Sequence, residues 1–220
     1  MQKKILVLLL VLFVAVSGYA AGVQPGLRLW AGATMSRYEG TPIPEGGFPE
    51  LIFKNSWRTG FNLGAGLEFK VSRTPLAFIL DLGYLETGTN LDVYDLDTKT
   101  GSYPYRLGTL SQKGLARMSF SGKWTPYLLL GYDLDFVLKH RGEPFGQGGP
   151  DLKADTKKTD FCLVAGAGLE LSRKKMSPFV EVRYHHGLVN LSRGAGSLEY
   201  YPNIKSRALV ISAGLKFGKS

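Results

Sequence analysis

The sequence has few of the residues from which catalytic and metal sites are built. Its 220 residues include one cysteine, Cys162, and three histidines. A single cysteine excludes a disulfide framework and a zinc site of paired cysteines. The chain also lacks a phosphate-binding glycine loop of the nucleotide-binding type, a His-Glu-x-x-His motif and a Cys-x-x-Cys pair. We therefore predict no catalytic, cofactor-binding or metal-ligating residue, and no cofactor.

Long hydrophobic runs are scarce, and the mean hydropathy is −0.03. The one run, Ile5 to Val16, follows two lysines and is shorter than the roughly 20 residues with which a helix spans a bilayer. Gly18 and Ala20 then stand at the −3 and −1 positions of a signal-peptidase site. The pattern predicts a signal peptide over residues 1–20, cleaved on export, and one domain over residues 21–220.

Basic residues outnumber acidic ones. The chain has 27 Lys and Arg against 18 Asp and Glu, a net charge of +9. Because an exported protein rarely meets nucleic acid, we expect no nucleic-acid partner. The basic surface favours anionic lipid or an acidic protein instead.

Two-residue periodicity dominates the rest of the chain, and we find no convincing helical period. From Trp57 to Val71, apolar residues such as Phe61 and Leu63 occupy one face, while glycines and charged residues occupy the other. Residues 128–139 and 161–171 alternate in the same way. Such strands are longer than the usual five or six residues of globular sheets and match the roughly 9–11 residues of a strand tilted across a bilayer.

A proline pattern marks three strand pairs. Thr74-Pro75, Thr125-Pro126 and Ser177-Pro178 each stand just before a strand, where proline costs no ladder hydrogen bond. Short turns and long polar segments then alternate, as in outer-membrane barrels. The sequence thus predicts an all-β fold, an eight-stranded antiparallel up-and-down transmembrane β-barrel with both termini on the side of the short turns. We place the short turns at 72–74, 122–125 and 172–177, the long segments at 39–56, 88–109, 140–158 and 192–204, the first strand at about 27–38 and the last at about 205–217.

The composition of the two faces indicates which one is inside. Soluble eight-stranded barrels such as lipocalins keep the apolar face inside, whereas membrane barrels reverse it. Here the polar face carries glycines and isolated charges of both signs, so we expect paired charges to plug a narrow lumen. The charged residues expected there are Arg58, Glu68, Lys70, Asp81, Arg117, Asp133, Asp135, Glu170, Glu181, Arg183 and Lys216.

Asp133 and Asp135 lie two residues apart on the lumen face and could be mistaken for a catalytic pair. We interpret both as salt-bridge partners. Cys162 falls on the same wall, and we interpret it as a small buried side chain.

His185 and His186 are adjacent, which suggests a metal site. Neighbouring side chains on a strand point to opposite faces, so the two cannot hold one ion. We expect His185 to join Glu181 and Arg183 in the lumen, and His186 to lie outside beside Tyr184.

The short turns are basic and contain no acidic residue. Two interpretations stay open: a solvated turn surface, or a basic periplasmic face that meets lipid phosphates or an acidic periplasmic or secretion-system protein. The residues are Arg73, Lys123, Arg173, Lys174 and Lys175.

The stretch "VEVRYHHGLVNL", followed by "NIKSRALVISAGLKF", resembles the PorT-like outer-membrane β-barrel proteins, which share an R-Y-x-x-G-L-x-N pattern before a final strand. "TPYLLLGYDLDF" and "GAGLEL" are similar to other segments of that family, and the resemblance is best over Thr125–Phe217. It implies a barrel in the outer membrane of a Gram-negative-type bacterium. The namesake of the family serves type IX secretion, and a role in secretion follows here by analogy alone.

Two classes of function remain. The first is a non-enzymatic barrel, in contact with outer-membrane lipid and lipopolysaccharide, that anchors or helps to assemble surface or type IX-like secretion machinery. The second is a lipid-modifying enzyme similar to a lipid A deacylase, with His186 as its base. The enzyme would need a serine on a neighbouring lipid-facing strand, and the sequence offers none at the right depth.

Overall fold

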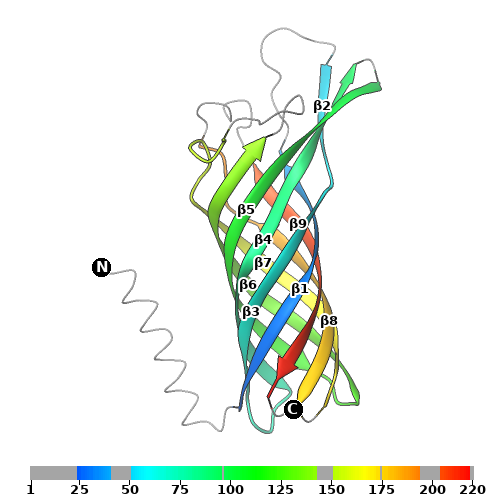
Figure 1. The fold of residues 1–220 in the computed structure, drawn as a ribbon, viewed down its shortest axis with the longest axis vertical. Helices are drawn as coiled ribbons and strands as arrows, with labels where there is room; N and C mark the ends of the chain where they lie inside the picture. The colour runs from blue at the N-terminus through cyan, green and yellow to red at the C-terminus, as the bar shows by residue number, and fades with distance from the viewer. Residues whose placement is uncertain are drawn as a thin grey trace, which may run out of the picture.

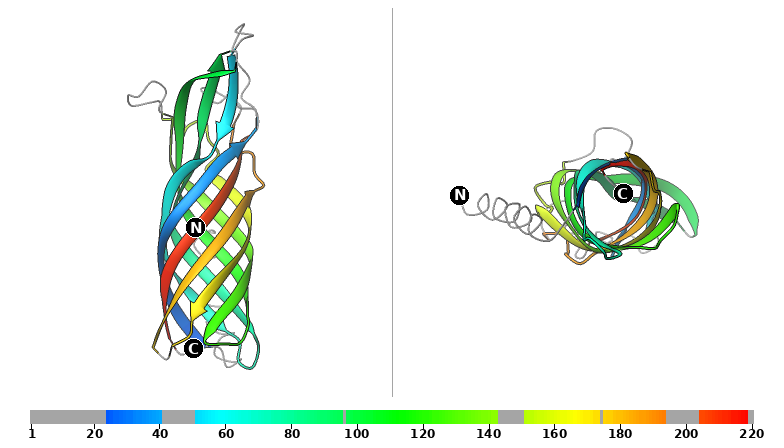
Figure 2. Two further views of the ribbon diagram at one scale, coloured as in Figure 1. Left: turned by 90° about the vertical axis from the view of Figure 1, so that its right-hand side faces the viewer. Right: turned by 90° about the horizontal axis from the view of Figure 1, so that it is seen from below.

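Eight antiparallel strands close into a ring in the order β4-β3-β1-β9-β8-β7-β6-β5, with β4 paired to β5 (Figures 1 and 2). The all-β barrel predicted from the sequence is confirmed. The strands are β1 (Gln24–Glu39), β2 (Leu51–Ser56), β3 (Arg58–Lys70), β4 (Leu76–Asp95), β5 (Thr98–Ser119), β6 (Trp124–Gly142), β7 (Thr159–Leu171), β8 (Met176–Gly187) and β9 (Lys205–Phe217).

The computed structural model describes residues 24–40, 51–95, 97–142, 151–173, 175–193 and 204–218. The expected signal peptide over residues 1–20 and Lys174 lie outside the described residues. The described part of the chain contains no helix that is long and apolar enough to cross a membrane.

An additional strand, β2, precedes the second strand of the ring, β3, where the sequence predicted a loop. β2 and β3 follow each other with Trp57 between them, and both pair with β4. Ser56 lies opposite Asn90, whereas the β3 pairing begins at Asn62 opposite Leu85. The prediction of a loop over residues 39–56 is therefore wrong over residues 51–56, because a strand of six residues that follows a segment rich in glycine and proline is hard to distinguish from a loop by composition.

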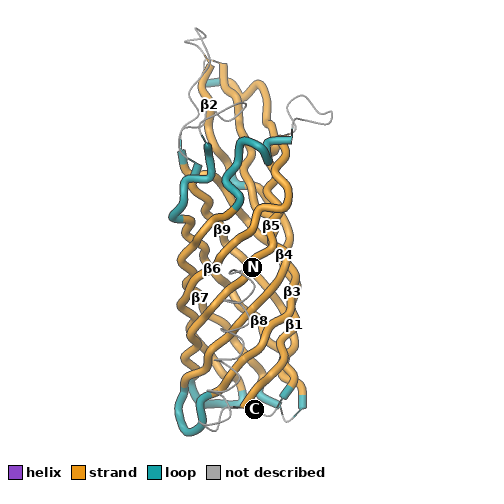
Figure 3. Tube along the Cα trace, turned by 90° about the vertical axis from the view of Figure 1, so that its left-hand side faces the viewer, coloured by secondary structure: helices purple, strands orange, loops and turns teal. Residues whose placement is uncertain are grey.

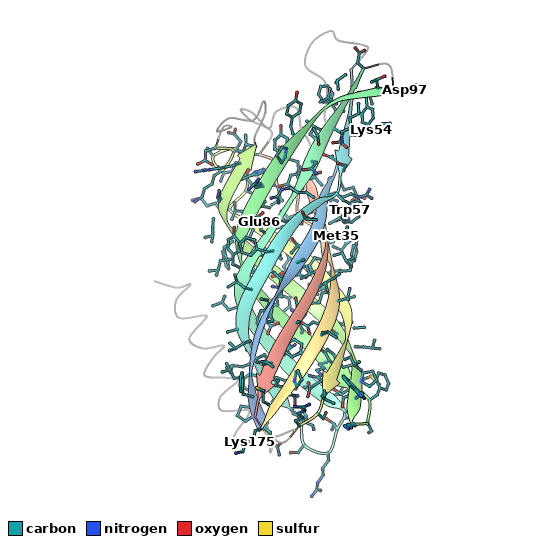
Figure 4. The ribbon with its side chains drawn as sticks, turned by 45° about the vertical axis from the view of Figure 1, so that its right-hand side comes forward. Met35, Lys54, Trp57, Glu86, Asp97 and Lys175 are labelled. Carbon is teal, nitrogen blue, oxygen red and sulfur yellow. The ribbon has the colours of Figure 1, made fainter. Side chains whose placement is uncertain are left out.

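The predicted long loop over residues 88–109 is also wrong. β4 and β5 continue through it as a paired ribbon, with Leu91 opposite Tyr103, and project beyond the ring (Figure 1). The turn at the tip uses Asp97 in the left-handed region, at a φ of 71°. Glycine and proline suggested a loop, yet continuous pairing between β4 and β5 keeps the backbone extended here. Figure 4 shows Asp97 at the tip and Lys175 at the opposite end of the molecule.

Short turns gather at one end of the barrel, the turn end, and longer connections at the other, the loop end (Figure 3). β1 begins and β9 finishes at the turn end, where Leu27 pairs with Phe217. The start of β1 and the end of β9 lie on the same side, as predicted. The predicted alternation of turn lengths fails at one connection, because β4 and β5 are joined at the loop end by a tight turn between Asp95 and Thr98.

Apolar side chains cover the outside of the ring. Leu130, Trp124 and Phe78 are 68%, 59% and 57% exposed, whereas Asp133 is fully buried. This arrangement reverses that of a soluble barrel, so the predicted assignment of the faces is confirmed.

Toward the loop end, the apolar belt stops at a defined level. On β6 it ends at Leu138, and the next outward residues, Lys139 and Arg141, are exposed and charged. On β1 it ends at Met35, before Arg37. Residues beyond this level lie outside the part of the barrel that contacts hydrocarbon.

Candidate functional site

Near the turn end, four charged residues from four strands form the lower quartet: Glu68, Arg117, Glu170 and Lys216. One Arg117 nitrogen, Nη1, lies 2.8 Å from Glu68 and 2.7 Å from Glu170. Lys216 Nζ lies 3.1 Å from Glu68 and 2.5 Å from Glu170. Each acid thus meets both bases, and the four charges cancel.

A second set, the central quartet, comprises Arg28, Asp81, Glu181 and Arg183. Arg28 Nη2 donates to Glu181 Oε2 at 2.9 Å, and Arg183 Nη2 donates to Asp81 Oδ2 at 2.9 Å. Arg183 also pairs with Glu181. The side chains of Arg28, Asp81 and Glu181 have no exposed surface. This layer therefore interrupts any column of water through the barrel.

Aromatic rings support the central quartet. The Tyr127 hydroxyl donates to Glu181 at 3.1 Å, and the Arg28 guanidinium lies 4.5 Å from the centroid of the Phe179 ring. The Tyr127 ring packs over Gly168, where a Cβ atom would stand 2.3 Å from Tyr127 Cζ. The glycine is needed because any side chain there would push the ring off the carboxylate.

A third group of charges lies closer to the loop end. Asp133 Oδ2 is 3.6 Å from Lys113 Nζ and 3.1 Å from His185 Nδ1, and Ser111 donates to Oδ1 at 2.6 Å. His185 is buried in the lumen as predicted, but the carboxylate that it contacts belongs to Asp133 rather than to a residue of its own strand. The reason is the level in the barrel: His185 stands two residues beyond Arg183 toward the loop end, within reach of Asp133 on β6.

Asp135 does not form the predicted salt bridge. Its carboxylate accepts a hydrogen bond from Thr109 at 3.0 Å, and no cation of the described residues pairs with it. Asp160 accepts from Ser206 at 2.6 Å, with Cys162 Sγ 3.6 Å from the same carboxylate. The two carboxylates and the thiol lie within 4.8 Å of one another, a spacing that a metal ion could bridge. Hydrogen bonds from neighbouring hydroxyls already account for this grouping, and Cys162 is buried as predicted.

At the loop end, an apolar cap closes the lumen. Two of its leucines come from the connections between strands rather than from the strands themselves. Leu152 N donates to His140 O at 2.9 Å, and Leu191 N donates to Ile204 O at 2.8 Å, which ties the connections to the barrel wall. The members of the cap are Tyr38, Leu91, Leu107, Val137, Leu152, Leu191 and Ile204.

His140 should make the cap sensitive to pH. It lies beyond the apolar belt, with Nδ1 2.6 Å from Thr156 Oγ1 and Nε2 3.2 Å from the Tyr38 hydroxyl. Burial lowers the pKa of His140 from 6.5 to about 4. The negative charge of Asp151 acts in the opposite direction and raises this pKa, but its effect is smaller. The neutral ring therefore makes its full contribution to the free energy of unfolding above pH 6.5. As pH falls toward 4, the unfolded chain takes up the proton more readily than the folded one, and the free energy of unfolding decreases by up to about 3 kcal/mol.

Urea unfolding in detergent micelles between pH 4 and pH 7 measures this loss. His140→Gln should flatten the profile over that window, since glutamine does not titrate. A variant profile that falls as steeply as the wild-type profile would contradict the assignment.

At the turn end, the lumen opens into a cavity of about 560 Å³, the basic mouth. The lower quartet forms its inner wall, and Lys70 and Arg73 contribute further positive charge at its rim. Hydroxyl groups complete the lining; they belong to Thr74, Ser119, Ser121, Thr125 and Ser172. The mouth thus offers cations and hydrogen-bond donors to a ligand that enters from this side.

Eleven charged residues were predicted to point into the lumen, and the structure confirms this for nearly all of them. Ten of the eleven are buried; Lys70 shares their face but is exposed at the mouth. Sequence reasoning missed Arg28, at the centre of the network, and Lys113. Arg28 could have been found, because Leu27 and Leu29 on either side are outward apolar residues.

The family model of the outer membrane protein beta-barrel domain matches residues 6–217. The chain belongs to this family. The solved structure of OprG, an outer membrane protein from Pseudomonas aeruginosa, is 13% identical, with 88% of this chain and 95% of OprG covered and a TM-score of 0.53. Neisserial surface protein A is 16% identical, with coverage of 87% and 96% and a TM-score of 0.49. At 13% identity the likeness to OprG shows the fold alone. Among curated proteins, none matches the chain in sequence.

An outer-membrane barrel carries its short turns on the periplasmic side. With that orientation the basic mouth opens to the periplasm, and the apolar cap and the β4–β5 projection face the outside. Among the described turn residues, Arg73, Lys123, Arg173 and Lys175 are exposed at the periplasmic end.

His186, the base of the alternative enzyme, lies on the outer wall as predicted. Its ring is half-buried and 6.3 Å from the Tyr184 ring, centroid to centroid. No serine or carboxylate of the described residues hydrogen-bonds to it. We expect His186→Ala to leave the acyl pattern of lipid A unchanged in mass spectra of extracted lipid. An altered pattern in the variant, at equal barrel abundance, would restore the enzyme hypothesis.

Proposed function

We propose that this barrel is a sealed, non-enzymatic anchor that docks an acidic segment of a periplasmic protein in its basic mouth. The observation that carries the proposal is the shape of the lumen: it has an open cavity toward the periplasm and two neutral quartets and an apolar cap behind it. A passage for solutes would need a continuous wet path instead.

The charge of the mouth favours an anion. The lower quartet is neutral by itself, so the additional cations at the rim, Lys70 and Arg73, leave the lining positive. Exposed Lys123 and Arg173 on the neighbouring turns extend the positive field around the opening. A peptide rich in Asp and Glu would gain charge-assisted hydrogen bonds there that an apolar segment would not.

The PorT-like sequence patterns suggest which machinery the partner belongs to. In this finer proposal the barrel assists surface assembly or type IX-like secretion from its periplasmic side. The support is the sequence resemblance over Thr125–Phe217 together with the basic periplasmic face.

Site-specific photocross-linking tests the docking. A photoreactive residue at Ser121, which lines the mouth, should form an adduct with a periplasmic protein in intact cells, and the linked peptide should be rich in Asp and Glu. Reversal of charge by Arg73→Glu, Lys123→Glu and Arg173→Glu should abolish the adduct. A single charge reversal at the external end, Lys54→Glu, should leave it intact. Adducts with lipid alone, or a protein adduct that persists after reversal at the mouth, would refute the proposal.

A further inference from the structure

The external end of the barrel carries a second basic surface, independent of the periplasmic mouth. On the β6–β7 side, the lipid-facing residues Phe136, Leu138 and Phe161 are exposed. Directly beyond them on β6 come the exposed Lys139 and Arg141. The boundary between apolar and cationic surface therefore falls within one or two residues of a strand.

Next to this boundary, residues 151–158 and Arg193 enclose a cavity of about 330 Å³. Three cations line it, Lys153, Lys158 and Arg193, with Asp151 as the single acid. The volume is near the lower end of ligand pockets, which begin at about 300 Å³.

The backbone around the cavity is fixed in place. Val137 N donates to Lys158 O at 2.9 Å, Lys157 N to Leu191 O at 2.8 Å, and Arg193 N to Asp155 O at 3.0 Å. These bonds join the segment to β6 on one side and to the connection after β8 on the other. The cations are thus presented by ordered backbone, and little ordering remains to oppose binding.

Within the part of the chain that the structure describes, the cations of this surface have no ion-pair partner. No carboxylate of the described residues forms an ion pair with any of its six cations, whereas three other cations of the external end are paired. Arg58 lies 2.7 Å from Glu86, Lys99 lies 2.8 Å from Asp92, and Arg207 pairs with Glu39. The six exposed cations of this surface are Lys139, Arg141, Lys153, Lys157, Lys158 and Arg193.

We propose that this surface binds the phosphorylated headgroup of a glycolipid of the outer leaflet. The phosphate lies in the cavity among Lys153, Lys158 and Arg193, and the acyl chains descend along the wall of Phe136 and Leu138. An amphiphile fits better than a soluble anion, because the cationic hollow directly adjoins apolar surface at the level of lipid headgroups.

Native mass spectrometry of the intact barrel in detergent tests the site, with three probes: bis-phosphorylated lipid A, enzymatically dephosphorylated lipid A and inorganic phosphate. The wild-type barrel should retain the phosphorylated lipid and release the dephosphorylated one. The triple variant Lys153→Gln, Lys158→Gln, Arg193→Gln should bind about 100-fold more weakly, since each cation near an anionic headgroup contributes a factor of roughly five.

The matched control removes the same number of charges at the periplasmic end, by Arg73→Gln, Lys123→Gln and Arg173→Gln, and should bind as the wild type does. A shift in electrophoretic mobility on boiling in SDS verifies that each variant is folded. Equal retention of the two lipids, wild-type affinity in the triple variant, or displacement of the lipid by millimolar inorganic phosphate would each overturn the proposal. Because different residues are involved, these outcomes are separate from those of the cross-linking at the mouth.

Discussion

Replacement of Arg28 by methionine should lower the free energy of unfolding by about 3–5 kcal/mol, the cost of removing one partner from a buried ionic network. Arg28 is fully buried, and its Nη2 and Nη1 lie 2.9 Å from Glu181 and 3.9 Å from Asp81. Without it, two acids share the single positive charge of Arg183 in a layer that water does not reach. Urea unfolding in detergent micelles, followed by tryptophan fluorescence, measures the change.

A double variant provides the control. Arg28→Met with Glu181→Gln removes one charge of each sign and leaves Arg183 paired with Asp81. It should recover a substantial part of the lost stability, because no uncompensated charge remains. A wild-type midpoint for Arg28→Met alone would show that the network does not depend on this residue.

The second large effect is expected in the apolar cap. Leu191 is fully buried, and its backbone accepts from Lys157 at 2.8 Å. Leu191→Asp would place a carboxylate among aliphatic side chains, which costs several kcal/mol unless the segment opens. We expect trypsin added outside intact cells to cleave after Lys157 or Lys158 about 100-fold faster than in the wild type, while the barrel stays inserted.

Leu191→Met is the matched control, since it nearly conserves volume and polarity. It should keep the resistance of the wild type to trypsin. If Leu191→Asp proved equally resistant, the connections would not depend on the cap for their order, and the role assigned to Leu191 would be wrong.

Much of the site could be predicted because strand periodicity is a local property. Glu68, Asp133 and Glu181 each alternate with apolar neighbours, so their direction follows from the chain itself. Asp135 shows where this reasoning stops. Its side chain points into the lumen as predicted, but among the described residues it lacks the expected cation. The nearby cation, Lys113, pairs with Asp133 instead, because the stagger of β5 against β6 sets the position of Lys113 along the barrel.

By itself, the sequence determined the class of fold, the eight strands of the ring, the lipid-facing wall and the charged lumen, since each follows from two-residue alternation and from turn residues nearby in the chain. Tertiary structure alone decided the pairs: Arg28 meets Glu181 across 153 positions of sequence. It also decided that residues 88–109 continue as strands and that Leu152 and Leu191 close the lumen. Closure of the ring fixes register and stagger, and these bring distant residues together in ways that no local pattern encodes.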